Sequence, residues 1–311
     1  MKKFIRRAID FLLSIVQILF KLLIGPIIDE RFRKFKNLNQ GTQQAILKYL
    51  YRNESAPNSY PLSTYGFSNF SQFEEDGILL YIFARIGETN RKVLELGAGS
   101  ARECMSSNLI INHNWNGFLV DGSEKNKEIA FKFFSQFNNT GILQPKFLVR
   151  WIAVENINSI CDEFELTGEI DLLSIDIDGN DYWVLKALDK VSPRVIVLEV
   201  QNAIPATEIV SRPYLATFNL HDYLGVERSF RGASISAFNF LLESRGYCLV
   251  GTNHNGVNAF FVRKDIAAGK LIKVNPSETL RDSYSLHQQK LWPKLSKFPW
   301  VRLEPQNDSS E

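Results

Sequence analysis

The chain has 311 residues, of which 45% are apolar, and its 36 basic side chains nearly balance its 34 acidic ones. This composition excludes a disordered, collagen-like or low-complexity protein, because the apolar fraction is large enough to form a core. The three cysteines, Cys104, Cys161 and Cys248, are far apart and cannot all pair, so a disulfide scaffold is not expected and a reducing compartment is favoured.

The N-terminal segment, residues 1–36, differs from the rest of the chain. It carries nine basic and three acidic side chains, which leaves 27 basic and 31 acidic for the remainder. A nucleic-acid partner is not expected, because it would need the basic surface on the folded domain. Polar positions from Lys3 to Lys21 recur every three or four residues within an apolar run, which predicts an amphipathic helix ending at Gly25-Pro26.

Three arrangements of this helix are compatible with its pattern. It can lie in the headgroup region with its basic ends on an anionic membrane surface, cross the membrane, or pack against protein. A crossing would place Gln17 and Lys21 in hydrocarbon, which is costly, and no small-residue cleavage site follows the apolar run as in a signal peptide. We predict a monotopic or peripheral anchor at the cytoplasmic face of a membrane.

The remaining chain is predicted to form a helical linker over 37–66, an α/β domain over 67–265 and a C-terminal tail over 266–311. The linker contains a short helix from Gln43 to Tyr51, and Trp292 and Trp300 suggest that the tail folds back. Within the domain, short β-branched runs alternate with helical ones, which predicts a doubly wound, mostly parallel sheet covered by helices on both faces.

The predicted strands are Lys92–Leu96, Gly117–Asp121, Lys146–Val154, Ile170–Asp178, Arg194–Val200, Tyr247–Gly251 and Val257–Arg263. The last two form an antiparallel pair through a turn. The predicted helices of the domain are Gln72–Ile86, Ala101–Asn112, Lys125–Gln136, Asn156–Phe164, Tyr182–Leu188 and Ala233–Arg245.

The first predicted strand runs into a glycine turn directly before a helix. Glu95 is followed by Gly97 and Gly99, and such a turn lets the backbone approach a ligand closely. The third glycine of a dinucleotide fingerprint is replaced by Arg102, which disfavours a pyrophosphate-bearing cofactor. A sulfonium nucleoside has no phosphates and remains compatible with the acidic-x-Gly-x-Gly pattern.

The second predicted strand ends in Asp121-Gly122, 22 residues after Gly99. A carboxylate at the tip of a neighbouring strand is suited to accept hydrogen bonds from the hydroxyls of a ribose. The alternative is that Asp121 only caps the helix that begins near Lys125.

The strand Ile170–Asp178 carries two further acids, Asp176 and Asp178, which an extended strand would point to the same face. Paired carboxylates at the carboxyl end of a parallel strand are costly unless a cation, a proton or a substrate hydroxyl lies between them. Asn180 or Asp181 is expected to cap the next helix. Glu199, at the end of the fifth strand, brings another carboxylate to the same edge.

The runs VLELGAGSARE, FLVDGSE, LLSIDIDGNDYWVLKAL and PRVIVLEVQN resemble the FkbM-like branch of S-adenosyl-L-methionine (SAM)-dependent methyltransferases, over about residues 67–265. The resemblance implies the seven-stranded class I methyltransferase sheet, whose last strand is antiparallel. It also implies cofactor contacts from Glu95, Gly97, Gly99, Asp121 and Gly122. By the same resemblance, Asp176 and Asp178 would face the transferred methyl group, although family members often carry Glu in place of Asp178.

We therefore expect a SAM-dependent O-methyltransferase acting on a sugar or lipid-linked glycan at a membrane. One carboxylate, of Asp176 or Asp178, would accept the hydroxyl proton. Mg²⁺ beside these acids and Glu199 is a less favoured possibility, and we assign no metal site. Two alternatives are a non-catalytic, membrane-associated adaptor that keeps the fold and a nicotinamide-dependent Rossmann enzyme.

Overall fold

The computed structural model describes residues 39–52 and 60–303. Nearly all of them belong to one compact unit, which begins at Gln40. The predicted helix in residues 1–36 lies outside the described residues. Among those that are described, no helix combines the length and the apolar character that a membrane crossing needs.

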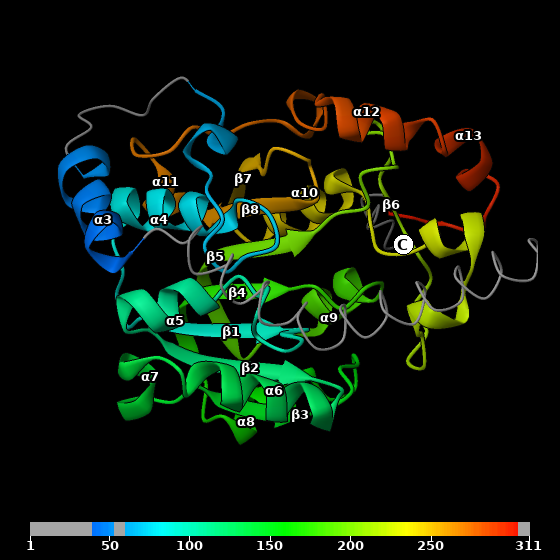
Figure 1. Ribbon diagram of the computed structural model, residues 1–311. Coiled ribbons are helices and arrows are strands. Elements are labelled where there is room, and N and C mark those ends of the chain that lie inside the picture. Colours follow the sequence, from blue (N-terminus) through cyan, green and yellow to red (C-terminus); the bar gives the residue numbers. More distant parts are fainter. Residues whose placement is uncertain (1–38, 53–59, 304–311) are drawn as a thin grey trace, which may run out of the picture. The chain divides into compact units, whose positions relative to one another are not determined.

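A seven-stranded sheet forms the centre of this unit, with the strand order β3-β2-β1-β4-β5-β8-β7 (Figure 1). Its strands are β1 Lys92–Leu96, β2 Asn116–Asp121, β3 Lys146–Val149, β4 Gly168–Ile175, β5 Val191–Glu199, β7 Tyr247–Thr252 and β8 Asn258–Arg263. The strands β3, β2, β1, β4 and β5, which are neighbours in this order across the sheet, are parallel. Strand β8, the last of the seven in the chain, is antiparallel to both of its neighbours, β5 and β7. This arrangement confirms the predicted fold class.

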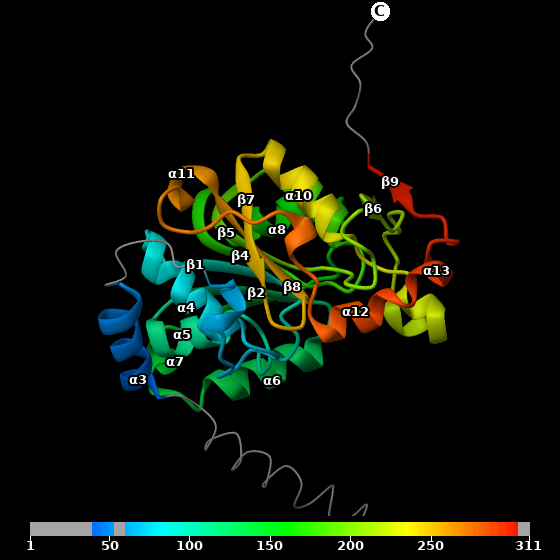
Figure 2. The same cartoon turned by 90° about the horizontal axis from the view of Figure 1, so that it is seen from above.

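Two hydrophobic cores lie on opposite faces of the sheet, because successive strand residues point in opposite directions. Leu94 and Leu96 belong to one core, with side chains of α8 Ile157–Glu163, α9 Asp181–Ala187 and α10 Ile235–Ser244. Val93 belongs to the other, with side chains of α4 Glu75–Ile86, α5 Ser107–His113 and α6 Glu124–Phe134. Seen from above, the sheet separates these two helix groups (Figure 2). Burial on both faces explains why the strands are almost continuously apolar.

The segments outside the predicted domain also pack against it. In α3 Gln40–Ala45, which continues into a π-helical stretch Ile46–Tyr51, Gln43 is buried and bonds to Asn108 and His113 of α5. At the other end, β9 Val301–Arg302 pairs with β6 Val210–Ser211, and Trp300 packs edge-on against Phe230. The C-terminal segment therefore folds back, as the sequence suggests.

The remaining helices are short. They are α7 Asn138–Ile142, α11 Lys264–Ala267, α12 Ser283–Gln289, α13 Trp292–Leu295 and the 3-10 turns η2 Leu62–Tyr65, η3 Leu220–Asp222, η4 Gly225–Ser229 and η5 Pro276–Glu278.

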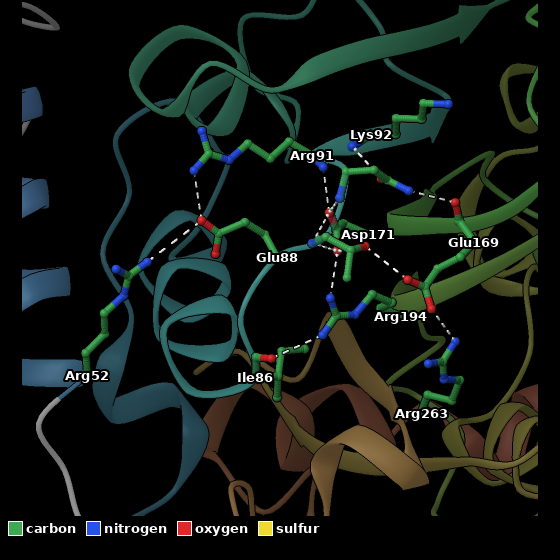
Figure 3. A network of polar contacts seen from close by, with 11 residues as sticks. Arg52, Ile86, Glu88, Arg91, Lys92, Glu169, Asp171, Arg194 and Arg263 are labelled. Carbon is green, nitrogen blue, oxygen red and sulfur yellow. Dashed lines mark hydrogen bonds and ion pairs between the residues drawn. The ribbon is translucent and has the colours of Figure 1, made fainter.

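A network of polar contacts lies at the edge of the sheet where the parallel strands begin, which we call the amino-terminal edge (Figure 3). Asp171 of β4 is fully buried, and its carboxylate accepts hydrogen bonds from the backbone N–H groups of residues 89–91. The guanidinium of Arg194, on the neighbouring strand β5, lies 3.3 Å away and also donates to the carbonyl of Ile86. The charge of this buried acid is thus matched by donors on several sides.

Candidate active site

A pocket of about 440 Å³ lies at the opposite edge of the sheet, where the parallel strands end. Ligands of open α/β sheets bind in this position, because the loops that follow the strands diverge there. The pocket is lined by residues that follow β1, β2, β3 and β4 and by the segment 218–221. Six of the seven predicted site residues line it, namely Gly97, Gly99, Asp121, Gly122, Asp176 and Asp178.

The glycine turn after β1 allows two loops to meet at the pocket floor. Gly97 has a φ of 88°, and a Cβ on it would lie 1.7 Å from the carbonyl oxygen of Asp176. Only glycine is compatible with this approach. Gly99 has a φ of 53°, and its N–H donates to Oδ2 of Asp121 over 3.1 Å. The glycine turn after the first strand and the acid at the end of the second are therefore joined by a hydrogen bond.

Asp121 is held by both of its carboxylate oxygens. Its Oδ1 accepts from the backbone N–H of Ser123 and from the side-chain amide of Asn126, both over 2.9 Å. The hydroxyl of Ser123, and not Asp121, caps α6 by accepting from the N–H of Asn126. The alternative role of Asp121 as a helix cap is thus taken by a neighbour, and Asp121 remains fixed at the pocket wall.

Glu95 does not line the pocket. Its side chain is 4% exposed, and its carboxylate accepts from the N–H groups of Met105 and Ser106 over 2.8 and 2.9 Å. Burial raises the pKa of this carboxyl. In this position Glu95 shapes the loop that leads into α5, and its direct contact with a cofactor stays a prediction.

Trp151, which none of the sequence motifs includes, lines the pocket beside Gly122. The indole ring lies over Gly122, where a Cβ would come within 3.1 Å of Cε3, and its Nε1–H donates to the carbonyl of Ala216. The sequence prediction extended the third strand to Val154, whereas β3 ends at Val149. The change from apolar residues to Arg150-Trp151 could have marked this end as another part of the pocket edge.

The acids after β4 come together for a different reason than predicted. The strand ends at Ile175, and Asp178 has a left-handed φ of 62°, so an extended strand does not align the two side chains. The turn nevertheless brings carboxylate oxygens of Asp176, Asp178 and Glu199 within 4.8 Å of one another. We call these three residues the acidic cluster.

Arg231, which sequence reasoning missed, pairs with this cluster. Its Nη1 contacts Oδ1 of Asp178, and its Nη2 lies 2.9 Å from Oε1 of Glu199. The residue follows η4, some fifty residues after Asp178 in the chain, so no local pattern marks it. Its guanidinium supplies a cation beside the three acids.

Burial and crowding determine the electrostatics of the acidic cluster. Burial, followed by the charges of Glu199, Asp181 and Asp178, raises the pKa of Asp176 well above its usual value. Burial also raises the pKa of Glu199 to about 7, while Arg231 acts in the opposite direction. At least one of these carboxyls therefore tends to keep a proton near neutral pH.

The two residues expected to cap α9 have other roles. Asn180 makes no capping bond, and its side-chain amide donates to the carbonyl of Leu215. The carboxylate of Asp181 accepts from the N–H groups of Ile177 and Gly179, both over 2.9 Å, and burial raises its pKa to about 6. Asn180 therefore occupies the predicted N-cap position, but the predicted capping bond is missing because the side chains of both residues bond to other segments.

The sheet order, the glycine turn bonded to Asp121 and the acids at the same edge define the architecture of a class I methyltransferase. The family model of the methyltransferase FkbM domain matches residues 56–247. The chain therefore belongs to the FkbM family of SAM-dependent methyltransferases, which confirms the resemblance seen in the sequence.

Several solved structures share parts of this fold at low identity. A SAM-dependent methyltransferase from Clostridium acetobutylicum is 12% identical, with 59% of this chain and 87% of that chain covered and a TM-score of 0.37. The O-methyltransferase TomG from Streptomyces achromogenes, solved with SAM, is 14% identical, with coverages of 74% and 96% and a TM-score of 0.38. These likenesses are too low to carry a functional argument. No curated protein matches the chain.

Proposed function

We propose that this protein transfers the methyl group of SAM to a hydroxyl group of a sugar or lipid-linked glycan at a membrane surface. The observation that carries the proposal is the composition of one pocket. It combines a glycine turn bonded to Asp121, suited to a nucleoside, with the carboxyl groups of Asp176 and Asp178, suited to accept a proton.

The reaction is an in-line displacement. The hydroxyl oxygen of the acceptor forms a bond to the methyl carbon, the carbon–sulfur bond breaks, and its electron pair returns to the sulfur. SAM becomes the neutral thioether S-adenosyl-L-homocysteine (SAH), and the hydroxyl proton passes to a carboxylate. Orientation of the reactants can contribute about 7–11 kcal/mol to such a step, and a positioned base roughly 10²–10⁴-fold.

Asp176 is the better placed proton acceptor of the two predicted catalytic residues. An oxygen of Asp178 is engaged by Arg231, whereas Asp176 forms no ion pair within the described part of the chain. Burial and neighbouring acids raise the pKa of Asp176, which makes its ionised form a stronger base. The assignment to Asp176 is part of the proposal.

The proposed membrane location and the proposed glycan acceptor are both inferred from the sequence of residues 1–36. Their basic side chains and apolar run fit an interfacial helix on anionic lipid at the cytoplasmic face. A hydroxyl-rich acceptor attached to lipid would be presented to an enzyme held there. Removal of residues 1–36 should release the protein from anionic vesicles, and retention on them at low salt would contradict the anchor.

Calorimetry with SAM and SAH, followed by transfer of labelled methyl groups into a membrane glycan extract, tests the activity. We expect both nucleosides to bind and the label to enter a hydroxyl-bearing glycan in a form stable to base. Binding of SAM without any transfer would favour the non-catalytic adaptor. Thermal stabilisation by NAD and not by SAM would favour the nicotinamide-dependent enzyme.

A further inference from the structure

The acidic cluster beside the pocket contains more negative than positive charge. The acidic cluster draws Asp176 and Asp178 from the turn after β4 and Glu199 from the end of β5. Asp181, at the start of α9, adds a fourth carboxylate behind them. Of the charged side chains in residues 39–52 and 60–303, Arg231 is the one that forms ion pairs with the cluster.

Such an arrangement cannot be fully ionised without another cation. Carboxylates that share a site repel one another, so one of them keeps a proton until a positive charge arrives. Asp176 and Glu199 are adjacent at the ends of neighbouring strands. Within the described part of the chain Arg231 pairs with Glu199 and Asp178, which leaves Asp176 without an ion pair. Carboxylate oxygens of Asp176 and Glu199 lie within 4.8 Å of each other, and the charge of Glu199 helps to raise the pKa of Asp176, so the first proton to bind serves both groups.

The two nucleosides that a methyltransferase handles differ in charge at one atom. SAM carries a positive sulfonium, and SAH carries a neutral sulfur, while their ribose, base and amino-acid parts are the same. A cation placed beside the acidic cluster favours the ionised carboxylates, whereas a neutral sulfur does not.

We propose that SAM binding expels the proton shared by Asp176 and Glu199 into solvent, that SAH binding leaves this proton in place, and that Arg231 limits the cluster to a single such proton. This inference rests on the proposed function only in requiring that the pocket bind SAM. The O–H bond of one carboxyl group breaks, the proton passes to buffer, and nothing is oxidised or reduced.

The exchange would prepare the base for the reaction. Once SAM is bound, Asp176 is ionised and can accept the hydroxyl proton. Methyl transfer then removes the positive charge from sulfur and adds a proton to the carboxylate, so the net charge of the site is unchanged. The complex with SAH has the same protonation as the empty pocket, and the proton leaves only when the next SAM arrives.

Calorimetric titration of the full chain with SAM and with SAH tests this directly. At pH 6.5, in the presence of a chelator, the binding heat is measured in two buffers of different ionisation enthalpy. We expect SAM to release about one proton more than SAH. Below pH 7, the affinity for SAM relative to that for SAH should therefore rise by up to about tenfold for each unit by which the pH increases. The α-amino group is common to both nucleosides and cancels in this difference.

Variants separate the cluster from other titrating groups. Glu199→Gln should still bind SAM and lose the extra proton release, whereas Arg231→Lys should retain it. Arg231→Met should extend the release to higher pH, because removal of the guanidinium favours protonated carboxyls. Arg228→Met, at an exposed position of η4, should behave like the unaltered protein. His221→Gln, which removes the histidine of the pocket lining, should retain the extra proton release whatever its effect on affinity.

The possible results distinguish the two proposals. Tight SAM binding with the same proton release as SAH would overturn the proton exchange and leave the proposed function standing. Loss of the extra release in His221→Gln and not in Glu199→Gln would overturn it as well, because the proton would come from the imidazole. No binding of either nucleoside to the unaltered protein would overturn both.

Discussion

The two edges of the sheet place acids on the same pair of strands with opposite results. At the amino-terminal edge, Asp171 of β4 faces Arg194 of β5 and three backbone N–H groups. At the carboxyl-terminal edge, Asp176 follows β4 and meets another acid, Glu199, at the end of β5. At the first edge the charge of the buried acid is matched by a cation and by backbone donors, whereas the second edge keeps an excess of negative charge beside a pocket. The comparison shows that acids on the same two strands have matched charges at one edge of the sheet and an unmatched charge at the other.

The strongest test of this comparison is to break the compensated edge. Asp171→Ala should lower the free energy of unfolding by about 3–5 kcal/mol, because it leaves the buried guanidinium of Arg194 without a counter-charge. Urea denaturation measures the loss. Glu169→Gln removes the charge of the more exposed pair with Arg263, while its amide oxygen can still accept from the hydroxyl of Thr89, so it should cost no more than about 1 kcal/mol. Equal losses in the two variants would contradict the assigned role of Asp171.

A second test addresses the close approach at the carboxyl-terminal edge. Gly97→Ala should lower the free energy of unfolding by about 1–3 kcal/mol through backbone strain alone, and its Cβ would also collide with the carbonyl of Asp176. We expect SAM binding, followed by calorimetry, to be lost with it. Gly141→Ala is the matched control, because a Cβ there meets nothing within 4 Å. Normal stability and binding of Gly97→Ala would show that the two loops are not closely packed.

The third test asks whether the joined motifs bind the nucleoside. Asp121→Ala removes the acceptor for the Gly99 N–H and the carboxylate proposed for the ribose, so we expect SAM affinity to fall at least about tenfold. Glu124→Ala, at an exposed position at the start of α6, should bind SAM normally. Unaltered affinity in a folded Asp121→Ala protein would remove Asp121 from the cofactor site.

The smallest effect, taken per pH unit, is the pH dependence of stability. The pKa of Glu199 is raised on folding to about 7, so above pH 4.5 the native state binds more protons than the unfolded state. Stability should therefore decrease as the pH rises from about 5 to 7, by at most about 1.4 kcal/mol per pH unit for this group.

Asp181 and Asp76 act in the same direction, since burial raises the pKa of each to about 6. Comparison with Glu199→Gln in urea unfolding from pH 5 to 8 isolates the contribution of Glu199. The variant should show a shallower decrease above pH 6. An identical pH profile would mean that Glu199 is already ionised in the empty pocket.

The sequence alone was sufficient for the strand and helix pattern, the two faces of the sheet and the edge at which the site lies. These features follow from short-range periodicity and from the rule that parallel strands all end at one edge. Gly97, Gly99, Asp121, Asp176 and Asp178 could be named for the same reason, because each lies at the end of a parallel strand or within three residues of it.

The tertiary structure decided which groups face these residues. Glu95 lies on a predicted strand, yet it points to the loop before α5. Arg231 and Trp151 come from irregular segments, whose positions depend on packing against distant parts of the chain. Local sequence sets the direction of a strand or a helix, but the counter-charge of a buried acid is determined by whichever side chain the completed fold brings within reach.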